Sequence, residues 1–318
     1  MLKKKKFDLI TVGGSTVDIC FYSKDGELVS TNNVSKQKLL AFEYGAKVVA
    51  DRVFTTCGGG ASNAAVSASR LGLKTAIFSR IGSDENARIV LSNFKANKVD
   101  SSFIKIDPKA ATAFSMVLTI DNPSKEHIAF IHRGANSNFS SKDLAFDKIS
   151  TEWFYVTSLP KDSWEDILIK LTATKKKIAW NPGNEQLKDV SKIKKLLPSI
   201  EILIMNRDEA LEFRKLKDIK GLIAHLHSLG PKLVVITDGD KGVYAFDSKT
   251  YYFMKAKTSR RVVNTLGVGD AFGSSLTSAL IYGKNIKQAL SWGITNSASI
   301  VSDIGAQKGL LTKKKIEK

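Results

Sequence analysis

The stretch with the clearest chemical content is Asn264–Phe272, which reads NTLGVGDAF and precedes a strongly helical segment. Gly267 and Gly269 remove side chains from the turn before that helix, where backbone N–H groups have no partner within the helix. Such a helix end binds anions through its free donors and its dipole. Asp270 among these donors is either an N-terminal cap worth about 1 kcal/mol or a base placed beside a negatively charged group.

A second candidate ligand site is Thr56–Ala65, with the sequence TCGGGASNAA. Three consecutive glycines cost backbone entropy, so a specific contact must require them. They allow a ligand to approach the backbone closely, and Asn63 offers an amide donor and acceptor at the start of a small-residue helix. The alternative is a flexible turn in which Ser62 or Asn63 caps the helix.

Asp18 is a third candidate because it lies six residues past the first predicted strand. We expect it on a turn after Gly13 and Gly14. An aspartate near the C-terminal end of a strand in an α/β sheet can bind the hydroxyl groups of a ligand. The alternative is a solvated loop aspartate, which is the more frequent situation for this residue type.

Several other kinds of site are excluded. The sequence has no Walker A pattern and no G-x-G-x-x-G fingerprint. Cys20 and Cys57 cannot build a disulfide framework or a four-ligand zinc site, so we expect two small core residues in a reduced, cytoplasmic compartment. The histidines show no metal-ligand spacing and are assigned no catalytic role: His127, His132, His225 and His227.

These polar residues must be positioned by regular elements, which the apolar pattern predicts. Short β-rich runs alternate with helical stretches, as in a parallel sheet with crossover helices. The predicted strands are Leu9–Val12, Thr75–Ser79, Trp153–Thr157, Lys177–Trp180, Ile202–Met205 and Leu233–Thr237, followed by a hairpin of Gly242–Phe246 and Tyr251–Met254. The predicted helices are Asn63–Leu71, one that begins at Asp84, Trp164–Leu171, Asp208–Lys215, Leu222–Leu229, Ala271–Tyr282 and Ile286–Ser299.

Two β-like segments, residues 21–56 and 113–131, interrupt this alternation. The second has short strand-like pieces around residues 121–126. The two segments form either a small separate sheet, such as a lid over a ligand site, or two ordinary loop excursions. Because no repeat, low-complexity tract or proline-rich linker divides the chain, we expect residues 1–318 to form a single domain.

The net charge of +18 suggests nucleic acid as a partner. However, +4 of it lies in Lys3–Lys6 and another +4 in the last eleven residues, and elsewhere lysines are scattered among acidic residues. No interleaved basic and aromatic stripe is present, so a basic solvated surface is the favoured interpretation. No apolar run approaches the roughly 18 residues of a membrane span, and we expect no membrane partner.

The order of these features resembles the ribokinase-like (PfkB) family of sugar and nucleoside kinases over nearly the whole chain. Any single match is weak, but six in order at plausible spacing are hard to obtain by chance. The six matching stretches are Gly13–Asp18 (GGSTVD), one signature made of Gly58–Asn63 (GGGASN) with Arg70–Gly72 and Arg80–Asp84 (RIGSD), and then Asn206–Glu209 (NRDE), Thr237–Gly242 (TDGDKG), Asn264–Asp270 (NTLGVGD) and Gly305–Gln307 (GAQ).

The resemblance implies a three-layer α/β/α sandwich with a mainly parallel central sheet and a small β lid formed by the two interrupting segments. It also implies ATP as phosphoryl donor and Mg²⁺ as cofactor. Asp270 would be the catalytic base, and the N–H groups of Gly267, Val268, Gly269 and Asp270 would form the anion hole. The remaining implied roles are sugar binding by Asp18, Gly58, Gly59 and Asn63, organisation of Mg²⁺ through water by Asn206 and Glu209, and nucleotide binding by Asn206, Glu209, Thr237, Gly239, Gly242 and Asn296.

Two positions depart from the family's D-T-x-G-A-G-D pattern. Asn264 replaces the first aspartate, which in many members helps to hold a monovalent cation. Asn264 and Gly305 are therefore a candidate K⁺ site in which the aspartate charge is missing. Val268 replaces alanine, which keeps the backbone N–H and adds bulk to the loop.

The leading expectation is an ATP-dependent kinase acting on a sugar hydroxyl. A nucleoside is an alternative acceptor, and so is a phosphorylated sugar such as fructose 6-phosphate, whose phosphate Arg133 is the best candidate to hold. A remote alternative is a non-catalytic protein that binds nucleic acid through the positive charge. The resemblance also raises a homodimer formed through the lid.

Overall fold

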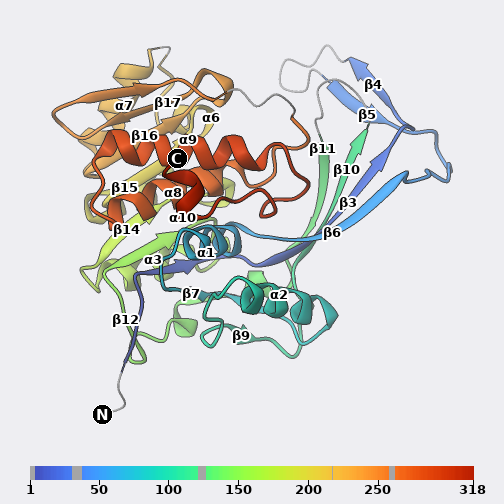
Figure 1. The fold of residues 1–318 in the computed structure, drawn as a ribbon, viewed down its shortest axis with the longest axis horizontal. Coiled ribbons are helices and arrows are strands. Elements are labelled where there is room, and N and C mark those ends of the chain that lie inside the picture. The colour runs from blue at the N-terminus through green and yellow to red at the C-terminus, as the bar shows by residue number, and fades with distance from the viewer. Residues whose placement is uncertain (1–3, 31–37, 121–126, 217, 258–261) are drawn as a thin grey trace.

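The computed structural model describes residues 4–30, 38–120, 127–216, 218–257 and 262–318. Its centre is an eight-stranded sheet with the order β18-β17-β16-β15-β14-β13-β2-β7 (Figure 1). The strands from β16 to β7 in this order run parallel to their neighbours. Strand β17 is antiparallel to β16, and β18 is antiparallel to β17. The bounds are β2 Leu9–Val12, β7 Thr75–Phe78, β13 Trp153–Val156, β14 Lys177–Trp180, β15 Ile202–Asn206, β16 Leu233–Thr237, β17 Val243–Phe246 and β18 Tyr251–Met254.

Helices cover both faces of this sheet, which gives the three layers expected from the alternation. One apolar cluster joins the sheet to α1 Gly60–Arg70, α8 Val268–Ile281, α9 Ile286–Ile300 and α10 Lys313–Ile316. The cluster on the other face involves α3 Trp164–Thr172, α5 Val190–Leu196, α6 Arg207–Leu211 and α7 Ile219–Ser228. The remaining helices are α2 Glu85–Ala96 and α4 Asn184–Leu187. Within the described residues, none of the helices has the length and apolar character needed to span a membrane.

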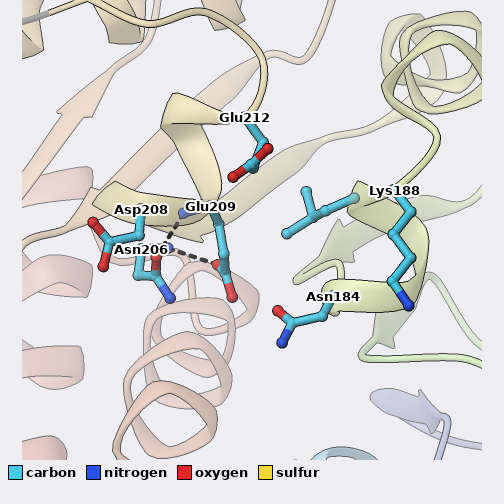
Figure 2. A pocket seen from close by; sticks show the side chains of 7 residues that line it. Asn184, Lys188, Asn206, Asp208, Glu209 and Glu212 are labelled. Atoms are coloured by element: carbon cyan, nitrogen blue, oxygen red, sulfur yellow. Dashed lines mark hydrogen bonds between the residues drawn. The ribbon is translucent and has the colours of Figure 1, made fainter. Parts of the chain in front are cut away.

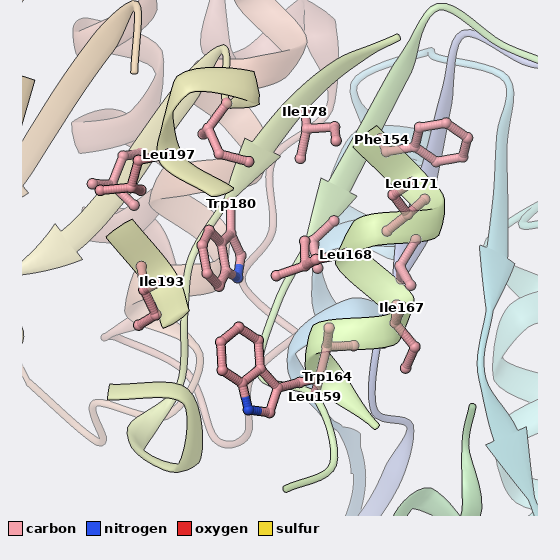
Figure 3. Packing of buried hydrophobic residues seen from close by; sticks show 14 of the residues in the cluster. Phe154, Leu159, Trp164, Ile167, Leu168, Leu171, Ile178, Trp180, Ile193 and Leu197 are labelled. Carbon is pink, nitrogen blue, oxygen red and sulfur yellow. The ribbon is translucent and has the colours of Figure 1, made fainter. Parts of the chain in front are cut away.

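The packing explains why the central strands read as continuous apolar runs. All residues of β2, β7 and β13 are buried, as expected for parallel strands covered on both faces. Figure 3 shows the α3 side of the core, where Trp164 of α3 stacks on Trp180 of β14 with ring centroids 6.3 Å apart. Their burial and that of the surrounding leucines and isoleucines hold α3 and α5 on the sheet.

The two segments that interrupt the alternation pair with each other in a second sheet, with the order β11-β10-β3-β6. We call it the small sheet. Its strands are β3 Thr16–Ser23, β6 Arg52–Gly58, β10 Phe114–Ile120 and β11 His127–His132. Figure 1 shows it extending away from the body, with the hairpin of β4 Glu27–Ser30 and β5 Lys38–Ala41 near its far end. Its first strand begins at Thr16, earlier than expected, and the strand-like pieces at 121–126 lie outside the described residues.

Two further parallel pairs of short strands tie the body together. They are β1 Lys5–Lys6 with β12 Ile149–Ser150, and β8 Arg80–Ile81 with β9 Lys105–Ile106.

The largest difference from the expected helices is α6, which ends at Leu211 although the apolar pattern predicts a helix to Lys215. The carboxyl ends of the parallel strands meet at one edge of the central sheet, where α/β folds bind ligands.

Candidate active site

The N-terminus of α8 has the open donors that the glycine pattern predicts. Gly267 has φ +72°, and a Cβ on it would lie 2.5 Å from the Cβ of Ala306, so only glycine fits this position. The first bond of the helical type runs from the Ala271 N–H to the Gly267 carbonyl. Among the described residues, no acceptor is bonded to the four preceding amides, residues 267–270. Together with the helix dipole, these amides offer a surface that can bind an anion.

The Asp270 carboxyl lies beside this surface and is partly buried. Its Oδ2 accepts a hydrogen bond of 2.8 Å from Nδ2 of Asn63, at the start of α1. Burial raises the pKa of Asp270 to about 6; the Asn63 bond opposes this rise, and the nearby Asp18 carboxylate adds to it. A carboxyl with this pKa is largely ionised at neutral pH, yet takes a proton more readily than an ordinary aspartate does.

Asp18 lies in the middle of β3, so the expectation of a turn residue is wrong. The strand begins two residues after Gly14, and Thr16–Ser23 pairs with β10 on one side and β6 on the other. Only 8% of Asp18 is exposed, and its Oδ1 accepts hydrogen bonds from Ser115 (2.7 Å) and Thr16 (3.2 Å). Burial raises the pKa of Asp18, and these two bonds act in the opposite direction.

The three-glycine run is required by contacts within the protein. A Cβ on Gly58 would lie 1.9 Å from Oδ2 of Asp18, and one on Gly60 would lie 2.9 Å from Oγ1 of Thr157. Gly59 adopts φ +88°, with its backbone against the Gly14 carbonyl. The run therefore allows β6 and the start of α1 to pack directly on Asp18 and on the end of β2, which brings Gly58, Gly59 and Asn63 to one place.

A cavity of about 140 Å³ opens next to these glycines. Arg133 lines it and is half exposed, with Nη2 3.9 Å from the Glu185 carboxylate. Asn136 also lines it, and its amide is held by the backbone of Ser15 through two hydrogen bonds. The residues that line the cavity are Gly13, Gly14, Thr16, Gly59, Gly60, Ala113, Ile131, His132, Arg133, Asn136, Ser137, Phe139, Ser158, Leu159 and Pro160.

A larger, open cavity of about 370 Å³ lies at the carboxyl end of β15. Figure 2 shows its two walls, with Asn206, Asp208, Glu209 and Glu212 on one side and Asn184 and Lys188 on the other. Asn206 and Glu209 form a reciprocal cap of α6, since Oδ1 of Asn206 accepts the Glu209 N–H and Oε2 of Glu209 accepts the Asn206 N–H, both at 2.8 Å. Burial raises the pKa of Glu209.

The predicted nucleotide residues divide into two groups. Thr237 pairs with Asn206 in the register of β15 and β16, so both end at the same sheet edge. Gly239 has φ +54° in the turn that follows, and Gly242 has φ +125° against the Met254 carbonyl. Asn296 does not fit the expectation of a nucleotide ligand. It is fully buried, donates to Ser67 and Ser275, and accepts the Leu311 N–H, so it joins α1, α8 and the C-terminal loop.

The predicted K⁺ site does not fit a cation. Asn264 is buried, and its Oδ1 accepts the Leu266 N–H at 2.9 Å. This bond turns Nδ2 toward the Asp303 carbonyl, to which it donates at 2.5 Å. The Asn264 N–H therefore occupies the carbonyl oxygen of Asp303, which a cation would need as a ligand. Gly305 has φ +81°, and a Cβ on it would lie 2.7 Å from Cγ2 of Thr56, so close packing accounts for this glycine.

Some residues of the site carry no recognisable signal in the sequence. Ser115 supplies the shortest hydrogen bond to Asp18, but a serine in a β-like run is common, and only the pairing of β10 with β3 reveals its position. Gln307 belongs to the quoted GAQ motif without an assigned role. Its Nε2 donates to Oδ1 of Asn63 at 2.8 Å, which places it behind the contact between Asn63 and Asp270.

Comparison with curated proteins gives relatives that are distant in sequence. The 5-dehydro-2-deoxygluconokinase of Bacillus licheniformis is 24% identical over 337 residues, covering 99% of this chain and 96% of its own. The cytidine kinase of Thermococcus kodakarensis is 24% identical over 282 residues, covering 88% of this chain and 97% of its own. Relatives at this distance act on different acceptors, so they do not identify the acceptor of this chain.

Solved structures show the same fold. The nucleoside kinase of Methanocaldococcus jannaschii, described as an archaeal member of the ribokinase family, superimposes with a TM-score of 0.79 at 18% identity over 98% of both chains. The ribokinase of Thermotoga maritima gives a TM-score of 0.80 at 17% identity, again over 98% of both chains. The family model described as pfkB family carbohydrate kinase matches residues 29–313. The chain therefore belongs to the pfkB family of carbohydrate kinases.

Proposed function

We propose that the protein transfers the γ-phosphoryl group of ATP to a hydroxyl group of a sugar, with Asp270 as the base. The observation that carries this proposal is the position of Asp270: a partly buried carboxyl with a pKa of about 6 beside four amides that have no acceptor among the described residues. A helix cap needs no such burial, whereas a base beside a phosphoryl group needs both features.

In the proposed reaction, the acceptor oxygen forms a bond to the γ-phosphorus as the bond from phosphorus to the β–γ bridging oxygen breaks. Asp270 takes the hydroxyl proton, and ADP leaves with the bond electrons. Phosphoryl transfer depends mainly on positioning and charge stabilisation. The amides of Gly267, Val268 and Gly269 would stabilise the phosphoryl oxygens, and Asp18 and Asn63 would orient the acceptor hydroxyls.

The oxygens of Asn206, Asp208, Glu209 and Glu212 around the larger cavity suit Mg²⁺, which prefers oxygen ligands and retains several waters. Within the described residues, no group of three acidic, histidine or cysteine side chains is placed to hold a metal directly. We therefore propose that Asn206 and Glu209 hold Mg²⁺ through its waters. The ion supplies charge neutralisation to the phosphates of ATP when bound.

We propose that residues 1–318 act as one kinase domain and that the small sheet is its lid. The face of the sheet that carries Asp18 also carries Cys20 and Tyr22, which pack with Leu266 and Ile304 near the anion-binding loop. Closure of the sheet over the acceptor would exclude water, the competing acceptor for the phosphoryl group.

The opposite face of the small sheet exposes the apolar side chains of Val53, Met116 and Phe130. Met116 and Phe130 lie opposite each other on β10 and β11. We propose this face as the contact between two copies of the chain. A molar mass from sedimentation equal to that of two chains would support the contact, and the mass of one chain at micromolar concentration would contradict it.

The acceptor proposal is tested with a coupled assay of ATP consumption against sugars, sugar acids, nucleosides and sugar phosphates. We expect turnover of a neutral sugar. A panel in which only nucleosides react would replace the sugar by the nucleoside alternative, and no turnover with any member would contradict the kinase reaction proposed here.

Arg133 separates neutral from phosphorylated acceptors. If the acceptor carries a phosphate, Arg133→Ala should raise its KM about tenfold with kcat nearly constant, because a charge-assisted hydrogen bond is worth about 1.5–3 kcal/mol. If the acceptor is neutral, KM should change less than about twofold, since the ion pair of the half-exposed Arg133 with Glu185 contributes little to acceptor binding. Steady-state kinetics on the best substrate of the panel makes the distinction.

We propose that catalysis here needs no monovalent cation, because the Asn264 amide joins the two loops that a cation would otherwise bridge. We expect equal rates and equal unfolding temperatures for the parent in potassium and tetramethylammonium chloride. Asn264→Asp replaces the N–H donor by an oxygen facing the Asp303 carbonyl, so the variant should unfold at a lower temperature in tetramethylammonium and recover in potassium. A parent enzyme stimulated severalfold by potassium would contradict the proposal.

A further inference from the structure

Asn63, the donor to Asp270, is itself held by a buried neighbour. Oδ1 of Asn63 accepts from Nε2 of Gln307 at 2.8 Å, and the same nitrogen donates to Oγ of Ser62 at 3.1 Å. Asn63 and Gln307 are only 4% and 7% exposed. The side of the Asn63 amide that faces Asp270 therefore depends on the orientation of the Gln307 amide.

The same kind of contact continues through α2 to the end of α1. Oε1 of Gln307 accepts from Nδ2 of Asn93 at 2.8 Å. Oδ1 of Asn93 accepts from Nδ2 of Asn97 at 3.0 Å, and Oδ1 of Asn97 accepts from Nε of Arg70 at 2.9 Å. Four amide side chains in succession thus connect Arg70, at the last turn of α1, with the carboxylate beside its first turn.

The direction of every bond in this series is determined by its two ends. The Arg70 guanidinium can only donate, and the Asp270 carboxylate can only accept, whereas each amide offers one donor side and one acceptor side. Only one orientation of all four amides satisfies both ends. The backbone independently confirms the orientation of the Asn97 amide, because its Nδ2 also donates to the Asn93 carbonyl, which accepts and never donates.

We propose that Arg70, Asn97, Asn93 and Gln307 are positioning residues for the reaction, acting as a directed hydrogen-bond series that keeps the Asn63 N–H on Oδ2 of Asp270. This inference rests on the proposed role of Asp270 as the base. The bond leaves Oδ1 of Asp270 for the acceptor hydroxyl and holds the carboxyl in one rotamer. It also favours the ionised form, which is the form that can take a proton.

Gln307→Glu tests the series with a side chain of the same shape that can only accept when ionised. Asn63 would turn its nitrogen toward the introduced carboxylate and present its oxygen to Asp270. Two facing oxygens need a proton between them, so the pKa of Asp270 should rise. We expect the acidic limb of kcat/KM, near pH 6 in the parent, to move up by about one unit. The rate would then fall about threefold at pH 6.5 and recover to within about twofold at pH 9.

Gln288→Glu is the matched control, because it makes the same chemical change at an exposed cap of α9. Gln288 accepts the Asn285 N–H there, and a glutamate accepts it equally well. Its pH profile should equal that of the parent. A folded Gln307→Glu whose acidic limb does not move, or whose rate falls equally at all pH values, overturns the inference.

Asn97→Asp tests the same inference if Gln307→Glu does not fold. The aspartate keeps its contact with Arg70 and loses the donor to Asn93, so we expect a smaller shift of the acidic limb in the same direction. An unmoved limb in this folded variant also overturns the inference. The activity of Asp270→Asn distinguishes failure of the proposed function from failure of the series. If Asp270→Asn is active, the proposed function is wrong. If it is inactive and the acidic limb does not move in the other variants, only the series is wrong.

Discussion

Asp270→Asn should lower kcat/KM about a thousandfold, because general base catalysis by a positioned side chain contributes roughly 10²–10⁴ to the rate. The asparagine has the same shape, and its oxygen can still accept the hydrogen bond from Asn63 that the carboxylate accepts now. The loss should therefore appear in kcat, while the binding of acceptor and ATP, measured by thermal shift, persists. A variant with activity within about threefold of the parent would contradict the role of Asp270.

The same substitution should stabilise the fold in a pH-dependent way. Burial raises the pKa of Asp270 from 3.8 to about 6 in the folded state. The folded protein therefore binds the proton more tightly than the unfolded chain, and this contribution to stability is lost as the pH rises from about 4 to about 6. Asp270→Asn removes that loss. Its unfolding temperature should match the parent near pH 4 and exceed it above pH 6, and a constant difference across this range would contradict the raised pKa.

Gly269→Ala should increase stability and remove most of the activity. A Cβ on Gly269 meets no atom of the described residues within 4 Å, and its backbone is helical, so the alanine fits and lowers the entropy of the unfolded chain. We expect a gain of about 0.4–1 kcal/mol in the free energy of unfolding. The methyl group would stand in front of the open amides, and loss of one such donor costs about 10²–10³ in kcat. Urea unfolding and steady-state kinetics measure the two effects.

Gly267→Ala is the comparison that separates folding from chemistry at this loop. The left-handed backbone costs a non-glycine residue about 1–2 kcal/mol, and its Cβ would collide with Ala306. Both alanine variants should lose activity, but their stabilities should change in opposite directions. A fully active Gly269→Ala would show that the space before the amides is not where the phosphoryl group reacts.

Much of the fold can be predicted from the sequence because its parallel strands are buried on both faces. Lys177–Trp180, Leu233–Thr237 and Tyr251–Met254 begin and end at the predicted residues. A short apolar run bounded by turns can be assigned to a strand without ambiguity when predicted helices alternate with such runs. The antiparallel hairpin of β17 and β18 is likewise predictable from its two β-rich runs and the short connection between them.

The small sheet can be predicted only in part. Its strands come from two segments about 60 residues apart, and pairing between distant strands leaves no local pattern in either. The glycines before Asp18 predict a turn there, yet the pairing of β3 with both neighbours extends the strand back to Thr16. The family resemblance assigns Asn296 to the nucleotide, and only the packing of α9 on α8 shows that this amide is enclosed.

The glycines show why spacing alone does not decide between a site and a scaffold. The run at Gly58 predicts a place for a ligand to approach, but the atom that approaches it is Oδ2 of Asp18. At Gly269 the space is open, as a ligand site requires. The residue type is the same at both positions, and only the neighbours distinguish an internal contact from an external one.

The contact of Gln307 with Asn63 has a consequence for protein synthesis. Asn63 is made early and Asp270 late, and the residue that orients their contact follows both, 244 positions after Asn63. A chain that stops short of Gln307 lacks the donor to Oδ1 of Asn63, so the Asn63 amide loses one of the two contacts that orient it. Under the proposed mechanism, the base Asp270 is therefore fully positioned only after Gln307 has been made and folded into place.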